Sequence, residues 1–441
     1  MGGARVVITD RAWRIQHPSQ RLSTWTAPRS ARPYFNTATR LDNCSSMRPE
    51  HPGTEHGSGR GGAQVRALVV EQGYSRGALA AVRALDQAGW QVGVGAPGGR
   101  GLAAASRSCA RRHPVPAAHA DQPAFLAAVA RAVREGGYQV VFGAGEAEVL
   151  TLSEHRDAVP AVVPHADHAA VLNALDKARL AEAAVAAGFE VPRVLSPGTL
   201  TDESRPVVVK ARLHARPGHA GSPPRIDTTV VVGATATRRR VAEIAALGGE
   251  AQVQEFVAGR LVAYAAVTTA DGRVVAQSLQ VASRVWPPGA GASCRAVSVP
   301  VEAGLAERAV ALLAALGWFG LAELQFLVPE DGRPRLIDLN GRFYGSLALA
   351  VAAGANLPAA WAALATGRLA ASEPAPVTAA AGVRYCWWEG ELRRAVRERR
   401  GGLVRDLAGA LGAGIGAVHS IGRWRDPAPA VVQLRRLLAD R

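Results

Sequence analysis

The residues of this sequence whose type is most selective for chemistry are its lysines, because there are only two. Of the 51 basic residues, Lys177 and Lys210 are the lysines and all the others are arginines. A lysine ammonium is a compact point charge on a flexible stem, which suits it to reach a phosphate oxygen in a tight pocket. Lys177 opens a predicted helix and Lys210 ends a run of valines, and a phosphate could bind at either position. The alternative is that the two lysines have no special function and remain by chance in an arginine-rich chain. Their positions argue against this alternative.

A second set of polar residues lies on a predicted β-hairpin, formed by residues 321–328 and 334–340 around a tight turn. Strand alternation places Glu323 and Gln325 on one face of the first strand. Pairing of the two strands would bring four polar side chains together: Gln325, Asp338, Asn340 and Arg342. Carboxylate and amide oxygens suit Mg²⁺, which takes its remaining ligands from water and phosphates. Taken alone, the hairpin fits an ordinary solvated sheet face equally well.

Residues 64–158 have the pattern of a small open α/β domain. The predicted strands are 65–70, 90–96 and 138–143, and the predicted helices are 78–89, 125–135 and one that starts at residue 146. This alternation predicts a parallel sheet. The segment Gly143–Ala144–Gly145 lacks the third glycine of a dinucleotide-binding motif, so an ordinary strand-to-helix turn is favoured there.

The next part of the chain mixes helices with strands that pair antiparallel. The predicted helices are 177–188, 237–247 and 307–316, and the predicted strands before the hairpin are 205–211, 228–233, 251–260, 261–270 and 273–280. A loop that contains Gly218 and Gly221 follows Lys210, and its backbone amides could cover phosphates. His214 and His219 in this loop are more typical of solvated residues than of catalysts.

The charge distribution argues against nucleic-acid binding as the main function. The net charge is +15, and residues 1–63 and 371–441 together hold +10 of it. Aromatic residues make up 5% of the chain, and no basic stretch is interleaved with them as a base-stacking surface requires. A nucleic-acid binder that depends on the +15 charge therefore stays the least favoured hypothesis.

Other features of the sequence limit the classes of protein to which the chain can belong. Residues 1–63 lack periodicity and are predicted to be a disordered basic extension, within which Met47 is an alternative start. The uncharged stretch 346–367 approaches the length of a membrane span, but Gly354 and Pro358 interrupt it, which predicts two short buried helices instead. The four cysteines form no CxxC pair, which fits a reducing cytosol better than a disulfide framework or a structural zinc site.

The order of these motifs over about 160–370 resembles the ATP-grasp superfamily, which includes biotin carboxylase, D-alanine–D-alanine ligase and the large subunit of carbamoyl phosphate synthetase. The motifs are the Asp–Lys helix start, VVVK, the glycine-containing loop, VQEFVAG and LQF…LIDLNGR. Residues 283–293 and 338–367 resemble a group of bacterial ATP-grasp carboxylate–amine ligases, and residues 69–90 resemble the domain that precedes ATP-grasp in that group.

The resemblance implies an α/β architecture in which two lobes sandwich ATP. It implies an ATP-grasp domain over 159–370, with a smaller lobe at about 190–260, after an open parallel α/β domain over 64–158. Residues 371–441 remain as a linker and a basic helical tail, in which a strand leads to a basic helix and a terminal helix follows. We expect this tail to pack on the catalytic domain, with Trp387 and Trp388 as buried anchors.

The resemblance also implies an activity: an ATP- and Mg²⁺- (or Mn²⁺-) dependent ligase that activates a carboxylate as an acyl phosphate for attack by an amine, releasing ADP and phosphate. Such an enzyme would act in the cytoplasm on small molecules, among them amino acids or peptides, and not at a membrane. The alternative from another class is an ATP-binding module of the same fold that does not catalyse the reaction.

Matching positions in the motifs give each residue an implied role. The implied phosphate-binding residues are Lys177 and Lys210, and the implied adenine-reading hinge is Gln254, Glu255, Phe256 and Val257. The implied metal ligands are Gln325, Asp338 and Asn340. Arg342 would face the transferred phosphoryl group, and Arg284 and Arg295 would hold the carboxylate or the acyl phosphate. Gly341 stands where the superfamily commonly has proline, which we expect to loosen that turn.

Overall fold

A computed structural model describes residues 64–213, 226–369, 375–399 and 401–439 of the chain. The predicted extension at 1–63 and the glycine-containing loop, with His214, Gly218, His219 and Gly221, lie outside these residues. Within the described residues, no helix combines the length and the apolar character that a membrane span requires. The uncharged stretch forms the two short helices that were predicted, α10 (Leu347–Ala352) and α11 (Leu357–Ala365).

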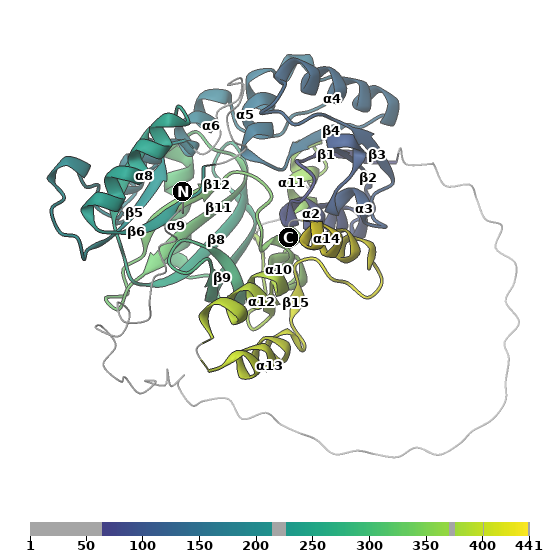
Figure 1. Ribbon diagram of the computed structural model, residues 1–441. Helices are drawn as coiled ribbons and strands as arrows, with labels where there is room; N and C mark the ends of the chain where they lie inside the picture. The colour runs from purple at the N-terminus through teal and green to yellow at the C-terminus, as the bar shows by residue number, and fades with distance from the viewer. Residues whose placement is uncertain (1–63, 214–225, 370–374, 400, 440–441) are drawn as a thin grey trace, which may run out of the picture. The chain divides into compact units, whose positions relative to one another are not determined.

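Four parallel strands form the first sheet, in the order β3-β2-β1-β4 (Figure 1). The strands are β1 (Arg66–Val70), β2 (Gln91–Ala96), β3 (Arg111–Pro114) and β4 (Val140–Gly143), and the helices are α2 (Arg76–Gln87), α3 (Leu102–Ala105), α4 (Gln122–Gly136) and α5 (Glu146–Glu154). The predicted parallel sheet is therefore confirmed. The sequence does not reveal β3, because its four residues RRHP are mostly polar and exposed.

A three-stranded antiparallel sheet, in the order β6-β5-β7, follows the helices α6 (His168–Leu175) and α7 (Lys177–Ala186). The strands are β5 (Pro206–Ala211), β6 (Thr229–Val232) and β7 (Ala251–Glu255), and α8 (Ala234–Ala246) packs against them. The prediction that β7 runs to residue 260 was wrong. At Gly259 the chain passes so close to Val328 that an added Cβ would lie 2.9 Å from the Val328 carbonyl oxygen, and the next strand begins only at Arg260.

The large sheet carries the predicted hairpin at one edge. Its strand order is β12-β11-β8-β9-β10-β14-β15, with the short strand β13 (Val377–Thr378) beside β9. The first five strands are β8 (Arg260–Thr268), β9 (Val274–Trp286), β10 (Ala292–Val299), β11 (Gly320–Val328) and β12 (Arg335–Asn340), and α9 (Ala303–Ala315) lies between β10 and β11 in the chain. β11 and β12 pair antiparallel, as predicted, with Gln325 opposite Asp338 and Glu323 opposite Asn340.

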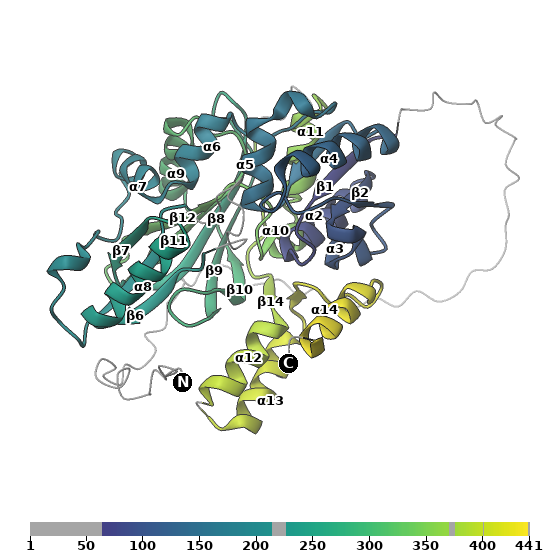
Figure 2. The ribbon, with the colours of Figure 1, turned by 45° about the horizontal axis from the view of Figure 1, so that its top comes forward.

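The C-terminal segment packs against the rest of the described chain, as expected. It contains β14 (Arg384–Cys386), α12 (Trp388–Glu398), α13 (Leu403–Gly414), β15 (Val418–His419) and α14 (Ala428–Ala439). Figure 2 shows α14 beside α3, and Asp426 just before α14 accepts hydrogen bonds from Arg83 Nε (2.8 Å) and Ser106 Oγ (2.6 Å). Trp387 and Trp388 are half-buried rather than buried, and the Arg76 guanidinium lies 3.7 Å from the centre of the Trp387 ring.

Candidate active site

The hairpin formed by β11 and β12 builds one side of the candidate site around Glu323. Oε2 of Glu323 accepts hydrogen bonds from Gln325 Nε2 at 3.0 Å and from Asn340 Nδ2 at 2.9 Å. Glu323 is 2% exposed, and burial raises its pKa to about 7, although these two hydrogen bonds act to lower it. Since both amide nitrogens donate to Glu323, the amide oxygens of Gln325 and Asn340 remain as the atoms that could bind a cation.

Lys177 reaches this hairpin from α7. Asp176 caps α7 by accepting from the backbone amide of Ala178 at 2.9 Å, and this cap fixes the position of the first helical residue, Lys177. The Lys177 side chain is almost completely buried, and its Nζ forms an ion pair and hydrogen bond with Oδ1 of Asp338 on β12. Such a buried ammonium requires a nearby anion, which Asp338 supplies in the structure as it stands.

Lys210 reaches the same strand from β5. Its Nζ donates to the carbonyl oxygen of Ile337 at 3.2 Å, and Ile337 directly precedes Asp338. The pKa of Lys210 is lowered to about 8, chiefly by burial and also by repulsion from Lys177, while Asp338 opposes the shift. The two lysines of the chain therefore meet on consecutive residues of β12, where a multiply charged anion would stabilise both ammonium groups.

The predicted adenine hinge comprises the last two residues of β7, Gln254 and Glu255, and the first two residues of the connection to β8, Phe256 and Val257. Gln254 is 4% exposed and Val257 7% exposed, while Glu255 and Phe256 are half-buried. Phe256 packs close to Gly289, in the loop between β9 and β10, at 3.4 Å from the position of an added Cβ. The hinge thus lies between the small antiparallel sheet and a loop of the large sheet, and it joins the two.

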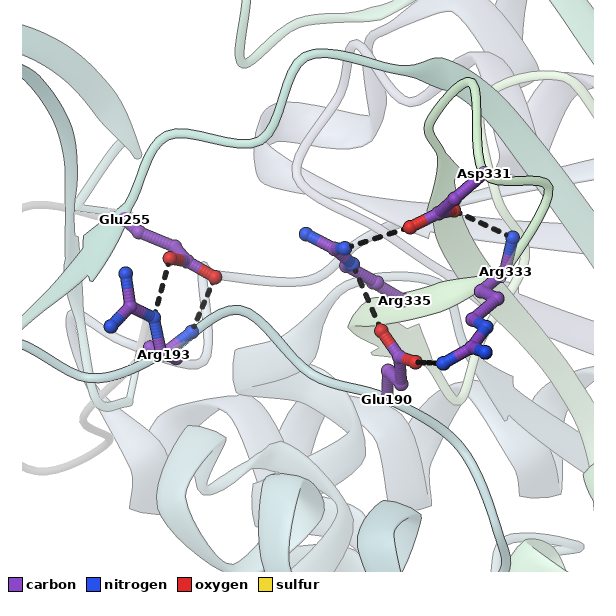
Figure 3. A network of polar contacts seen from close by, with 6 residues as sticks. All are labelled: Glu190, Arg193, Glu255, Asp331, Arg333 and Arg335. Atoms are coloured by element: carbon purple, nitrogen blue, oxygen red, sulfur yellow. Dashed lines mark hydrogen bonds and ion pairs between the residues drawn. The ribbon is translucent and has the colours of Figure 1, made fainter.

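A cavity of about 550 Å³ opens beside Glu255. Its walls combine apolar with charged side chains: Val185, Phe189, Glu190, Val191, Arg193, Glu255 and Arg335. Figure 3 shows the ion pairs around it, with Arg193 Nε 2.8 Å from Glu255 Oε2 and Arg335 Nε 3.2 Å from Glu190 Oε2. Burial acts to raise the pKa of Glu255, but the hydrogen bonds and charge of Arg193 outweigh burial and hold this pKa below its usual value.

Arg342 lies between the hairpin and the first sheet. Its NH2 is 3.4 Å from Glu146 Oε1 at the start of α5, its NH1 donates to the Phe343 carbonyl oxygen at 3.3 Å, and its buried Nε has no partner among the described residues. The expectation that Gly341 loosens this turn stays a prediction, although the glycine itself is closely packed. An added Cβ at Gly341 would lie 2.1 Å from the buried Trp318 ring, so the indole fills the place of a side chain.

Arg284 and Arg295 lie opposite each other on β9 and β10 and meet a partner that the sequence did not reveal. Glu391 of α12 is fully buried; it pairs with Arg295, whose Nε donates to its Oε2 at 2.7 Å, and Arg284 NH1 is 4.0 Å from the same oxygen. Arg394 approaches it at 3.9 Å. Among the described residues, no contact joins Arg284 or Arg295 to the lysines or to the hairpin.

The residues of the hairpin fit a magnesium ion better than a metal held by many charged ligands. The described part of the chain contains no cluster of three or more His, Cys, Asp or Glu residues that could hold a metal. The hairpin carries one carboxylate, Asp338, which pairs with Lys177 in this structure, and two amide oxygens. Mg²⁺ takes its remaining ligands from water and phosphates. Glu323, which accepts from both amide nitrogens, is a residue of this site that was not among the predicted site residues. Strand alternation signalled it, because it shares a face with Gln325.

Comparison with protein families finds one match, over residues 271–391, to the family described as "ATP-grasp in the biosynthetic pathway with Ter operon". Comparison with curated proteins finds no match. Among solved structures, the chain is similar to an L-amino acid ligase from Bacillus licheniformis at 15% identity, with a TM-score of 0.54 and coverage of 71% of this chain and 78% of that one.

Two further structures are similar over comparable lengths. Biotin carboxylase from Campylobacter jejuni is 14% identical with a TM-score of 0.53, covering 73% of this chain and 74% of that one. N5-carboxyaminoimidazole synthetase from Staphylococcus aureus, complexed with ADP, is 12% identical with a TM-score of 0.54, covering 76% of this chain and 86% of that one. At these identities the likeness establishes the fold, and the predicted ATP-grasp fold is confirmed.

Proposed function

We propose that this ATP-grasp protein is an ATP- and Mg²⁺-dependent ligase, which activates a carboxylate as an acyl phosphate and joins it to an amine. The observation that carries the proposal is the meeting of Lys177 and Lys210 on consecutive residues of β12. A chain that otherwise uses only arginine as a strong base has placed both ammonium groups beside one carboxylate and two amides. Triphosphate is the substrate group that this arrangement suits best.

In this proposal, ATP binds where the small antiparallel sheet faces the hairpin. Lys177 and Lys210 bind phosphate oxygens, and the backbone of the hinge at Gln254, Glu255, Phe256 and Val257 binds the edge of the adenine. The Staphylococcus aureus synthetase, which has the same fold, was crystallised with ADP. Binding of the phosphates would replace Asp338 as the anion beside Lys177 and leave Asp338 able to face a metal ion.

The proposed metal ligands are Asp338 and the amide oxygens of Gln325 and Asn340, with Mg²⁺ or Mn²⁺ as the ion. When bound, the ion would neutralise charge on the phosphate oxygens. Glu323 is a positioning residue here: by accepting from both amide nitrogens, it turns both amide oxygens away from itself.

The arginines supply positive charge to the reacting groups. Attack of a carboxylate on the γ-phosphate concentrates negative charge, and fixed cations lower the barrier without a covalent protein nucleophile. Arg342, with its unpartnered Nε, would face the transferred phosphoryl group. Arg284 and Arg295 would hold the substrate carboxylate, for which the carboxylate of Glu391 now stands in.

A non-catalytic ATP-binding module is the second candidate, and one observation favours it. Gln325 is neutral and Asp338 is engaged by Lys177, so the candidate metal site offers little negative charge. Such a module would bind nucleotide and release no ADP when substrates are added.

The test is ADP release by the full chain, assayed with pools of amino acids and small carboxylates in the presence of Mg²⁺. The ligase proposal expects substrate-stimulated release that falls at least about 100-fold in Lys210→Ala and Asn340→Ala, because each removes a group bound to the phosphates or to the ion. Release that both substitutions leave unchanged would contradict the proposal. We propose that this reaction takes place in the cytoplasm.

A further inference from the structure

A second group of acidic residues lies at the carboxyl edge of the first sheet. Glu71 directly follows β1, while Glu146 and Glu148 lie in the first turn of α5, which follows β4. β1 and β4 are neighbouring parallel strands, so their carboxyl ends meet at one edge. In open α/β sheets, ligands bind at this edge. None of the roles proposed above uses these three carboxylates.

Two of these carboxylates are buried with incomplete hydrogen bonding. Glu71 is 3% exposed and Glu148 is 1% exposed. Oε2 of Glu71 accepts from the backbone amides of Gly73 and Ser75, at 3.0 and 2.9 Å, and the backbone amide of Ala103 also acts to lower the pKa of this carboxyl group. Its Oε1 nevertheless lacks a hydrogen bond of good geometry among the described residues. Oε2 of Glu148 has none either, although Gln72 hydrogen-bonds to the same carboxyl group. Unpartnered buried oxygens are unfavourable, so both atoms point to a donor that a ligand would supply.

Glu71 and Glu148 both have pKa values close to neutral pH. The pKa of Glu71 is raised to about 7, chiefly by burial and also by the nearby Glu148, against the backbone hydrogen bonds that lower it. Burial likewise raises the pKa of Glu148 to about 7. Groups with such pKa values can both bind a cation and accept a proton from it at physiological pH.

Arg342 connects this edge of the sheet to the hairpin. Its NH2 lies 3.4 Å from Glu146 Oε1, and its charge acts on Glu148. The two parts of the chain are in tight contact here, since a Cβ added to Gly77 in α2 would lie 2.4 Å from the Phe343 carbonyl oxygen. The carboxylates therefore lie just across Arg342 from the proposed phosphoryl-transfer site.

A small cation with several N–H groups is the ligand that best satisfies two buried carboxylate oxygens. A primary ammonium group offers three donors and a full positive charge. We propose that Glu71 and Glu148 bind the ammonium group of the amine substrate, which is therefore a primary amine that arrives protonated, such as the α-amino group of an amino acid. This inference rests on the proposed function and adds to it the class of nucleophile.

The proton balance of the step assigns a further role to these residues. The ammonium group gives one proton to the carboxylate of Glu148 and becomes a neutral amine. The nitrogen lone pair then attacks the carbonyl carbon of the acyl phosphate, the C–N bond forms, and the C–O bond to phosphate breaks with its electron pair on oxygen. The second proton of the nitrogen leaves with the phosphate as hydrogen phosphate, and Glu148 returns its proton to solvent.

Hydroxylamine gives a test that separates amine binding from carboxylate activation. It is largely uncharged at neutral pH and traps acyl phosphates as hydroxamates, so it needs no ammonium site. With the full chain, ATP, Mg²⁺ and the twenty amino acids, we would measure amide formation and, separately, hydroxamate formation. In Glu148→Gln and Glu71→Gln, the ratio of amide to hydroxamate should fall roughly tenfold to a hundredfold, as expected for loss of a hydrogen bond to a charged group.

The control is Glu154→Gln, at the exposed far end of the same helix, which should leave the ratio unchanged. Thermal unfolding of each variant checks folding, and loss of an unsatisfied buried charge should raise the midpoint or leave it unchanged. The ratio of amide to hydroxamate stays constant if a substitution leaves both products unchanged or lowers both equally. A constant ratio in both test variants would overturn this inference and leave the proposed function untouched. A wild-type protein that forms no hydroxamate with any carboxylate would instead overturn the proposed function, and this inference with it.

Discussion

Buried glutamates at the hairpin and at the edge of the first sheet have the same pKa shift but different surroundings. Burial raises the pKa of both Glu323 and Glu148 to about 7. Oε2 of Glu323 accepts from two side-chain amides, whereas Oε2 of Glu148 accepts from none among the described residues. A shifted pKa therefore does not by itself mark a ligand site. Hydrogen bonding separates a carboxylate that holds its neighbours from one that requires a further partner.

Because we propose that the phosphates bind beside the hairpin, the largest effect on activity is expected there. Lys210→Arg should lower ADP release at least about 100-fold, because a planar guanidinium cannot replace a point charge in this buried position. The assay is substrate-stimulated ADP release, with the thermal midpoint as a control for folding. Near-normal turnover of Lys210→Arg would contradict the argument that the two lysines bind phosphate.

Removal of the two carboxylates should change stability in different ways. Glu323→Leu should lower the free energy of unfolding by about 2–4 kcal/mol, because the buried Asn340 amide and the half-buried Gln325 amide lose their acceptor. Glu148→Leu should stay within about 1 kcal/mol of wild type or exceed it, because it removes an unsatisfied charge. Urea unfolding of both variants measures the two values, and equal losses would remove the distinction between the two sites.

The pH dependence of stability should expose the first-sheet carboxylates. Their pKa is higher in the folded chain, about 7 against an ordinary value of 4.5, so their contribution to stability is full below pH 4.5 and is lost as the pH rises to 7. Each group should contribute at most about 3 kcal/mol to this fall in the free energy of unfolding. In urea titrations between pH 4.5 and 7, Glu148→Gln should reduce the fall in the free energy of unfolding, whereas Glu154→Gln should not. If wild type and Glu148→Gln lose the same free energy across this range, the raised pKa of Glu148 would be contradicted.

The smallest effect concerns the turn that carries Arg342. Gly341→Ala should lower the free energy of unfolding by about 1–3 kcal/mol, because the new Cβ overlaps the Trp318 ring. Trp318→Leu in the same chain should recover part of this loss, since the two sites are in contact. Additive losses in the double variant would mean that the two residues do not compete for the same space.

Local sequence patterns predicted the strands, the hairpin and the face of β11 that carries Gln325, because alternation and turn residues are local properties. The meeting of Lys177 with Asp338 had to be inferred from residue type, since 161 residues separate them. The Glu391 partner of Arg295 could not be found, because α12 comes to β10 only through tertiary packing. The end of β7 depended on a contact between Gly259 and Val328, which no local pattern contains.

The first-sheet glutamates illustrate the same limit. Glu148 follows a Gly–Ala–Gly segment that was correctly interpreted as a strand-to-helix turn, yet its burial and its missing partner become visible only when β1 and β4 lie side by side. Sequence patterns located the edge of the sheet. The tertiary structure was needed to identify which of its carboxylates lack a donor.

Calorimetric titration of ADP in the presence of Mg²⁺ tests the central claim most directly, because it requires neither substrate. We expect saturable binding to the wild-type chain and to Glu154→Gln, and an affinity at least about tenfold lower for Lys177→Ala and Lys210→Ala, since each loses a charge-assisted hydrogen bond to phosphate. Equal affinity in all four proteins would contradict the account, because it would mean that the two lysines do not share a phosphate site.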